Sequence, residues 1–142
     1  MTERTAGEEI TALLHEYAYR LDAGDLDGVC ALFGHAELRS TRHDRVLRGA
    51  AEARTLFEPV VLHGDGTPQT MHQITNVTVV VEDDLASSRC YFTVLQVTRL
   101  GLHPILVGEY RDRLEFVDGQ WRFVERLFDP RLFGDLSEHM RS

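Results

Sequence analysis

The sequence predicts one α+β domain in which helices pack on one face of a curved sheet. Its 142 residues fit a single domain, 1–142. Apolar residues recur at helical spacing in the first part of the chain, and from residue 69 they alternate and become rich in β-branched types. A run of helices followed by a run of long strands is typical of the α+β class.

Three helices and one short, polar pair of strands are predicted in the first part of the chain. Spacing of apolar residues predicts the first helix over residues 5–23 and the third over residues 50–62. Asp25 caps the second helix, which ends at Gly34, and residues 36–48 are expected to form two short strands. The apolar face of the first helix consists of Ile10, Leu13, Leu14, Tyr17 and Leu21.

Four strands are predicted in the second part of the chain, over residues 70–81, 86–98, 105–117 and 120–128. Asp118-Gly119 is a typical hairpin turn, and residues 101–104 are expected to be a connection. Pro130 is expected to end the last strand, and residues 132–140 are expected to form a short C-terminal helix.

Composition excludes several classes of function. With a net charge of −8, the chain lacks the basic face that nucleic acids bind. Its fifteen cationic residues are all arginine, so no side-chain amine is present for a Schiff base. No apolar stretch approaches the ~18 residues that span a bilayer, and the first residues lack the apolar core of a signal peptide. We therefore expect a cytoplasmic protein that binds neither nucleic acid nor membrane.

No motif for a metal or a cofactor is recognised, and neither is expected. Cys30 and Cys90 are interpreted as buried free thiols, with a disulfide or a nucleophile as the alternatives. The seven histidines lack metal-ligand spacing, and no nucleotide-binding loop is present. A basic cluster is interpreted as a solvated face, with capture of a substrate's carboxylate or phosphate as the alternative. It consists of Arg39, Arg42, His43, Arg45 and Arg48.

Asp22 and His72 are the first candidates for chemistry. Asp22 falls in the last turn of the first helix, where the helix dipole disfavours an anion by roughly 0.3–1 kcal/mol. It is therefore either a solvated surface residue or a functional one. Alternation places His72, Ile74 and Asn76 on one strand face, where His72 is either a hydrogen-bonded core residue or a base. A carboxylate on one imidazole nitrogen would fix the tautomer of the ring.

Local motifs resemble those of the SnoaL-like branch of the nuclear transport factor two-like superfamily. One is Glu16-Tyr-Ala-Tyr-Arg-Leu-Asp-Ala-Gly-Asp-Leu-Asp27, followed by Leu32-Phe33. The others are His72-Gln-Ile-Thr-Asn76, Gly108-Glu-Tyr-Arg-Asp112 and Asp118-Gly-Gln-Trp-Arg-Phe-Val-Glu-Arg126. The resemblance runs nearly end to end. It implies a cone-shaped, curved, mixed or antiparallel sheet, with three N-terminal helices closing an internal pocket.

The resemblance also implies site residues. In scytalone dehydratase, bile-acid 7α-dehydratase and hexachlorocyclohexane dehydrochlorinase, an Asp and a His pair at the places of Asp22 and His72. Tyr17 is similar to a tyrosine acting on the substrate oxygen, with core packing as the alternative. Arg126 matches a pocket arginine, with a sheet-edge pair to Asp129 as the alternative. Tyr19 is a competing candidate for the role of Tyr17. The other residues expected to contact substrate or line the pocket are Gln96 and, with core packing as the alternative, Asn76 and Tyr110.

Three positions depart from the motifs of individual relatives. Gln96 stands where scytalone dehydratase has a second histidine, and Leu21 stands where it has a tyrosine. Arg89-Cys-Tyr91 replaces the Arg-x-Asp pair of limonene-type epoxide hydrolases. These departures argue against those two specific activities.

Two hypotheses for function follow. In the first, the chain is a cofactor-free lyase, cyclase or isomerase with dehydratase-type chemistry on a small apolar carbonyl compound, such as a polyketide or steroid-like molecule. His72 is the base and later the acid, and Asp22 orients it. Tyr17 and Arg126 polarise the substrate oxygen. In the second, the domain is a non-catalytic hydrophobic-ligand-binding or structural subunit.

Assembly into a homo-oligomer is expected from the outer face of the sheet. A strongly bent sheet covers only its concave side with helices, so apolar residues on the other side need a partner. A symmetric dimer is predicted, with a trimer as the alternative. The residues expected on this outer face are Val79, Val81, Ile105 and Val107.

Overall fold

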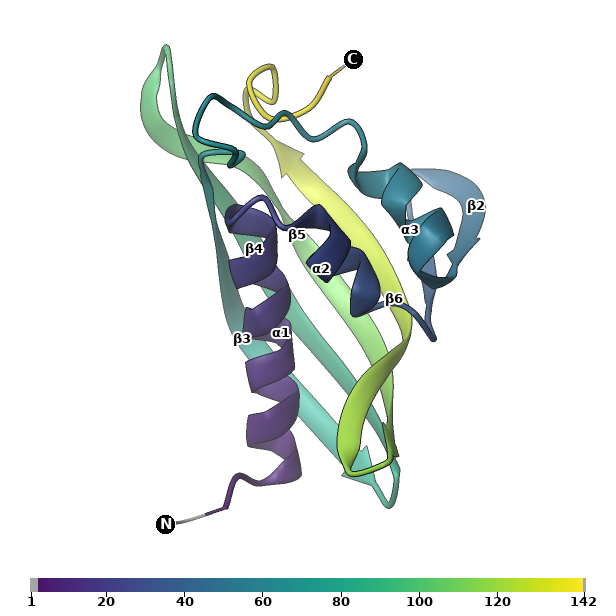
Figure 1. Cartoon of the computed structure of the whole chain (residues 1–142). Coiled ribbons are helices and arrows are strands. Elements are labelled where there is room, and N and C mark those ends of the chain that lie inside the picture. The colour runs from purple at the N-terminus through teal and green to yellow at the C-terminus, as the bar shows by residue number, and fades with distance from the viewer. Residues whose placement is uncertain (1–2, 142) are drawn as a thin grey trace.

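The chain folds as three helices followed by a long meander of strands, with a small hairpin inserted between the second and third helices (Figure 1). The computed structural model describes residues 3–141, so Met1, Thr2 and Ser142 of the predicted domain lie outside the described residues. The helices are α1 (Ala6–Asp22), α2 (Leu26–Ala31) and α3 (Gly49–Phe57). The strands are β1 (Glu37–Ser40), β2 (His43–Arg48), β3 (Thr70–Glu82), β4 (Leu85–Thr98), β5 (Gly101–Val117) and β6 (Gln120–Phe133).

The strands form one curled, open sheet in the order β2-β1-β6-β5-β4-β3. The β1–β6 pair is parallel and the other four pairs are antiparallel, so the sheet is mixed. The helices lie across its concave face, α1 over the β3 side and α2 over β5 and β6 (Figure 1). The predicted α+β class with three N-terminal helices on a curved sheet is confirmed.

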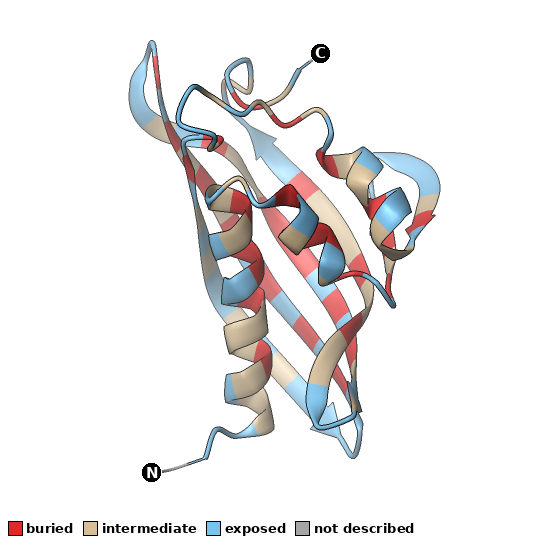
Figure 2. Cartoon of the chain, in the orientation of Figure 1, coloured by how far each residue is buried: buried red, intermediate tan, exposed pale blue. Residues whose placement is uncertain are grey.

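Local sequence explains where the first two helices begin. The hydroxyl of Thr5 accepts the backbone N–H of Glu8 at 3.1 Å, and the carboxylate of Asp25 accepts that of Gly28 at 2.9 Å. Each cap satisfies a donor that the first helical turn leaves unpaired. One stripe of α1 is buried against the sheet, as Figure 2 shows in red. It contains Ile10, Leu14, Tyr17, Ala18 and Leu21.

The prediction that Pro130 ends the last strand is wrong. Strand β6 continues to Phe133, and Pro130 pairs with Gly108 of β5 next to a shift in register. Such an irregularity accommodates a residue that has no N–H to donate. A Cβ on Gly108 would lie 2.4 Å from the carbonyl oxygen of Asp129 and 2.8 Å from the Phe92 ring. Glycine therefore permits the close approach of β6 at this point.

The predicted C-terminal helix over residues 132–140 is also wrong. After β6 the chain makes a turn over residues 137–139 and runs back beside the segment that follows α3. The backbone N–H of Val61 donates to His139, and that of Arg141 donates to Pro59, both at 2.8 Å. These long-range hydrogen bonds outweigh the helical spacing of the apolar residues. We call residues 134–141 the C-terminal segment.

Three other predicted boundaries shift. Helix α3 ends at Phe57 rather than at residue 62, because Pro59 has no N–H to extend the helix. Residues 101–104, expected to be a connection, are the first residues of β5. Strand β3 contains a bulge at Asn76, which has a φ of 55° and is exposed. The bulge ends the simple alternation, so Val77 rather than Asn76 continues the inward face.

The outer face of the sheet is apolar, but of the residues expected there only Val107 belongs to its apolar pairs. Ile105 is fully buried and Val79 packs against the core, so neither supplies outer surface. The register instead places three apolar cross-strand pairs there, and four of their side chains are 65–70% exposed: Met71, Val97, Leu102 and Leu132. The pairs are Met71–Leu95, Val97–Leu102 and Val107–Leu132. Among residues 3–141 no helix is long and apolar enough to cross a membrane.

The homo-oligomer therefore stays a prediction, now with a defined surface. Light scattering at micromolar concentration should report about twice the 16.2 kDa of one chain. Leu102→Glu would place a charge in the outer apolar face and should shift the mass toward that of the monomer, whereas Leu62→Glu, outside the sheet, should not. A wild-type protein that stays monomeric at all concentrations would contradict this expectation.

Candidate active site

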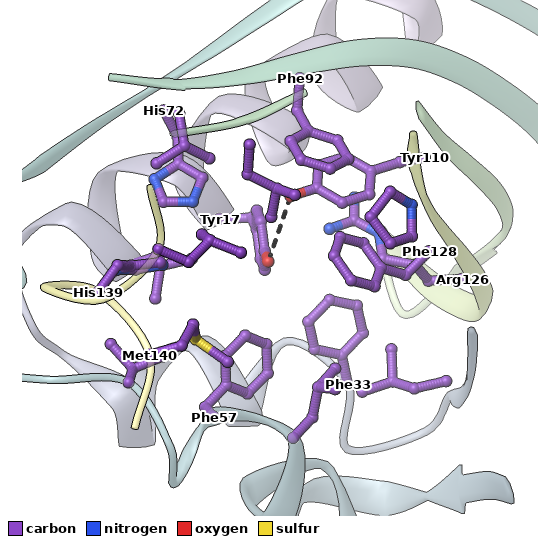
Figure 3. Close-up of a pocket in the computed structure, with 18 of the residues that line it drawn as sticks. Tyr17, Phe33, Phe57, His72, Phe92, Tyr110, Arg126, Phe128, His139 and Met140 are labelled. Carbon is purple, nitrogen blue, oxygen red and sulfur yellow. Dashed lines mark hydrogen bonds between the residues drawn. The ribbon is translucent and has the colours of Figure 1, made fainter. Parts of the chain in front are cut away.

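A cavity of about 210 Å³ lies between the helices and the concave face of the sheet (Figure 3). An apolar cavity of about 150 Å³ already accepts benzene, so this one has room for a small ring compound. Its wall is largely aromatic and aliphatic, with few polar groups, as is typical of small-molecule sites. The apolar residues of the wall include Leu21, Phe33, Leu38, Leu56, Phe57, Val60, Phe92, Val94, Leu106, Phe128, Pro130, Phe133, Leu136 and Met140. The polar ones are Tyr17, Arg39, His72, Tyr110, Arg126 and His139.

Asp22 and His72 form a hydrogen-bonded pair beside this cavity. The two residues are fifty positions apart in sequence, and the contact joins the last turn of α1 to the start of β3. His72 Nδ1 lies 2.6 Å from Asp22 Oδ1. The same carboxylate accepts the Thr70 hydroxyl and the backbone N–H of His72, each at 2.8 Å. The His72 side chain is only 4% exposed, so the imidazole is shielded from bulk water, while the Asp22 side chain is 21% exposed.

This geometry determines which nitrogen of His72 can act as a base. An ionised carboxylate only accepts hydrogen bonds, so in the pair the Nδ1–H of His72 donates a hydrogen bond to Asp22 and Nδ1 keeps its proton. In the uncharged ring the lone pair is then on Nε2. The ring lines the cavity, and a proton taken up on Nε2 would produce an imidazolium that the adjacent carboxylate stabilises.

Tyr17 and Tyr110 supply two hydroxyl groups to the cavity. Tyr17 comes from α1 and Tyr110 from β5, and their oxygens lie 3.5 Å apart, with Tyr110 donating. Figure 3 shows Tyr17 between the histidines and Arg126. Burial raises the pKa of both phenols above the ordinary value, so both hydroxyls remain protonated at neutral pH. The Tyr17 proton is thus available to an oxygen of a ligand.

Arg126 lies deeper, below these two rings. Its guanidinium carbon is 3.9 Å from the ring centroid of Tyr110 and 4.4 Å from that of Tyr17. It makes a bidentate pair with Asp112 on the adjacent strand, at 2.7 and 2.9 Å. The partner is therefore Asp112 and not Asp129, which pairs with Arg131 on the outside. Within the described residues Nη1 of Arg126 is buried and has no hydrogen-bond partner.

Three of the residues expected to contact substrate lie elsewhere. Asn76 is in the exposed bulge of β3, and Tyr19 is 72% exposed on the outer side of α1. Gln96 is buried, but its amide donates to the carbonyl oxygens of Pro68 and Glu138 at 3.0 and 3.4 Å. It therefore joins the loop before β3 to the C-terminal segment. None of the three lines the cavity.

Two residues of the site were not singled out from sequence. Asp112 was hidden because only pairing of β5 with β6 places it opposite Arg126. His139 was assigned to a helix that does not form, and it enters the cavity from the C-terminal segment. The usable signal for Asp112 was its position two residues after Tyr110 on the inward face of β5.

The cysteines and the basic cluster add little to the chemistry. Cys30 and Cys90 are free and buried, and burial raises the pKa of Cys90 to about 11, so it is a poor nucleophile at neutral pH. Of the basic cluster only Arg39 lines the cavity, and it pairs with Glu37 at 3.1 Å. Over residues 3–141 no group of three His, Cys, Asp or Glu side chains is placed to hold a metal ion.

Comparison with known proteins agrees with this architecture. The sequence matches the model of the SnoaL-like domain over residues 2–127. No curated protein is significantly similar to the chain.

Solved structures of several bacterial proteins are similar. One is a variant of Rv3472 from Mycobacterium tuberculosis, of unknown function, at 26% identity and a TM-score of 0.70, covering 87% of this chain and 74% of that one. A second is an NTF2-like protein with a cystatin-like fold from Novosphingobium aromaticivorans. It has 25% identity and a TM-score of 0.74, and the match covers 92% of this chain and 84% of that one. A proposed scytalone dehydratase from the same species, at 24% identity, a TM-score of 0.70 and 89% and 85% coverage, shows the shared fold alone.

Substitutions in the buried Arg126–Asp112 pair are predicted to change the free energy of unfolding. Arg126→Met would leave a fully buried carboxyl without its partner, at a cost of about 3–5 kcal/mol in the free energy of unfolding. Adding Asp112→Leu should recover most of this loss, because an apolar pair has no charge to desolvate. Urea unfolding of both variants, with exposed Arg45→Met as the control, measures the effect. A loss below about 1 kcal/mol in the single variant would show that the pair is not buried as described.

Proposed function

The chain belongs to the SnoaL-like domain family, and from its cavity we propose that it is a cofactor-free acid–base enzyme. The proposed reaction class is that of a lyase, cyclase or isomerase acting on a small apolar carbonyl compound, of polyketide or steroid-like type. Fold alone does not decide function, so the proposal rests on the site.

The observation that carries the proposal is the His72–Asp22 pair at the edge of an apolar cavity. A carboxylate hydrogen-bonded to one nitrogen of a shielded imidazole is the arrangement that turns the other nitrogen into an oriented base. The low exposure of His72 reduces competition from water, and electrostatic effects are stronger in such an environment.

The proposed reaction begins with removal of a proton from the carbon next to the substrate carbonyl. His72 Nε2 takes the proton, and the C–H electron pair moves into the carbonyl group to form an enolate. The Tyr17 hydroxyl donates a hydrogen bond to the enolate oxygen, and the Arg126 guanidinium, whose carbon lies 4.4 Å from the Tyr17 ring centroid, supplies positive charge nearby. The His72 imidazolium then returns the proton, either to another carbon, which completes an isomerisation, or to a leaving hydroxyl group, which departs as water.

One observation favours the non-catalytic alternative, in which the cavity only binds a hydrophobic ligand. The charge of Arg126 is neutralised by Asp112, and most of the cavity wall is apolar. Such a cavity would bind a neutral ligand without any proton transfer. The two functions differ in whether His72 exchanges a proton with the ligand.

Proton exchange provides the experimental test. Small cyclic ketones and β-hydroxy ketones are incubated with the protein in D₂O, and deuterium entering the carbon next to the carbonyl is followed by NMR. The wild type should catalyse this exchange, and His72→Ala and Asp22→Asn should each lower the rate about 10²- to 10⁴-fold. His43→Ala, on the exposed hairpin, is the matched control and should leave the rate unchanged.

Ligand affinity, measured alongside, separates the two functions. Unchanged affinity with lost exchange in the two variants supports the enzyme. If the wild type binds these ketones and exchanges no deuterium, the acid–base proposal is wrong and the binding module is favoured.

A further inference from the structure

His139 is a second imidazole in the cavity, supplied by the C-terminal segment. Its ring centroid lies 6.3 Å from that of His72, and Figure 3 shows both rings on the side of the cavity away from Tyr110 and Arg126. His139 as a whole is only 4% exposed. Its backbone is fixed at both ends, because its N–H donates to Leu136 at 3.0 Å and its carbonyl oxygen accepts from Val61 at 2.8 Å. The ring is therefore a permanent part of the wall.

The ring is held in its uncharged form. Burial, together with the nearby charge of protonated His72, lowers the pKa of His139 to about 4, and His63 acts in the same direction. Asp22 opposes these effects but does not outweigh them. At neutral pH the two imidazoles therefore do not compete for one proton.

The surroundings of His139 also indicate which nitrogen carries its proton. Nδ1 is buried and has no hydrogen-bond partner among residues 3–141. A buried N–H without a partner is rarer and more costly than a buried lone pair without one, so the lone pair is favoured on Nδ1. The N–H is then on Nε2, which is not among the covered, unpartnered atoms as Nδ1 is, and His139 lines the cavity. His139 is thus a neutral donor in a wall that is otherwise mostly apolar.

We propose that His139 Nε2–H donates a hydrogen bond to a hydroxyl oxygen of the ligand that lies between the His139 and His72 rings. Since Tyr17 offers a donor further along the cavity, the ligand would carry a hydroxyl at the histidine end and a carbonyl oxygen at the tyrosine end. This identifies the substrate class as a neutral, ring-sized hydroxy ketone. The inference rests on the proposed function and adds a catalytic residue to it.

In the elimination reaction the role of His139 is specific to one step. When the carbon–oxygen bond of the hydroxyl group breaks, its electron pair remains on oxygen, and the His72 imidazolium supplies the proton that completes water. His139 stabilises the negative charge that develops on this oxygen without itself losing a proton. The earlier removal of the C–H proton depends on His72 and Tyr17 and does not require His139.

A pair of simple probes tests the binding part of the inference without any turnover. Phenol carries a hydroxyl group where toluene carries a methyl group of similar size, and calorimetry gives their affinities. The wild type should prefer phenol, and His139→Leu should reduce this preference about 3- to 10-fold, as expected for one lost hydrogen bond. His139→Gln retains a donor and should keep most of the preference. His43→Leu, with an exposed histidine, is the matched control and should keep all of it.

Kinetics tests the catalytic part. With a cyclic β-hydroxy ketone, His139→Leu should slow loss of water about 10²-fold or more, the effect of removing one donor to a developing oxyanion. Deuterium exchange at the adjacent carbon should change much less. A phenol preference that is unchanged in His139→Leu, or equal loss of exchange and elimination, would overturn the inference. Absence of exchange in the wild type would instead refute the proposed function, and the phenol–toluene comparison would still decide the role of His139.

Discussion

The hydrogen bonds that Asp22 makes with β3 determine the geometry of the whole cavity. They join the last turn of α1 to Thr70 and His72 at 2.6–2.8 Å, and the preceding residues Tyr17 and Leu21 of the same helix line the cavity. A carboxylate at a helix C-terminus is disfavoured by roughly 0.3–1 kcal/mol. Three donors to a charged acceptor are each worth about 1.5–3 kcal/mol, so they outweigh this penalty. A locally unfavourable residue is thus stabilised by the contact that orients the candidate base.

A second buried charge sets the opposite side of the cavity. Arg126 and Asp112 are both almost fully buried, and four aromatic rings surround the guanidinium within 5.4 Å. Replacing such a pair by apolar residues is often neutral or stabilising, so its presence is not explained by stability. In the proposed reaction its use is electrostatic, since the Arg126 guanidinium lies against the ring of Tyr17, whose hydroxyl meets the substrate oxygen on which charge develops.

Local sequence was sufficient to predict the elements that depend on local interactions. The cap at Asp25, the apolar stripe of α1 and the alternation in β4 all formed as expected, because their determinants are within a few residues. The pairing of Asp22 with His72 was predicted through a family resemblance. Periodicity alone left a solvated surface role open for Asp22.

The failures arose where distant contacts override local preference. Pro130 remains in β6 because Gly108 on the neighbouring strand lets the backbone approach, and no pattern within β6 reveals this. The C-terminal segment has helical spacing, yet it pairs with the chain after α3. That single misassignment concealed His139. Asn76 was placed in the cavity by strict alternation, which a bulge interrupts at that residue.

The most direct test of the account is the tautomer of His72. Nitrogen-15 NMR of protein labelled in its histidine rings identifies which nitrogen carries the proton, at a pH that leaves the ring uncharged. The account predicts a proton on Nδ1, hydrogen-bonded to Asp22, and a bare Nε2 available to a substrate. A proton on Nε2 in the uncharged ring would contradict it, because His72 would then present a donor to the cavity and could not act as the base.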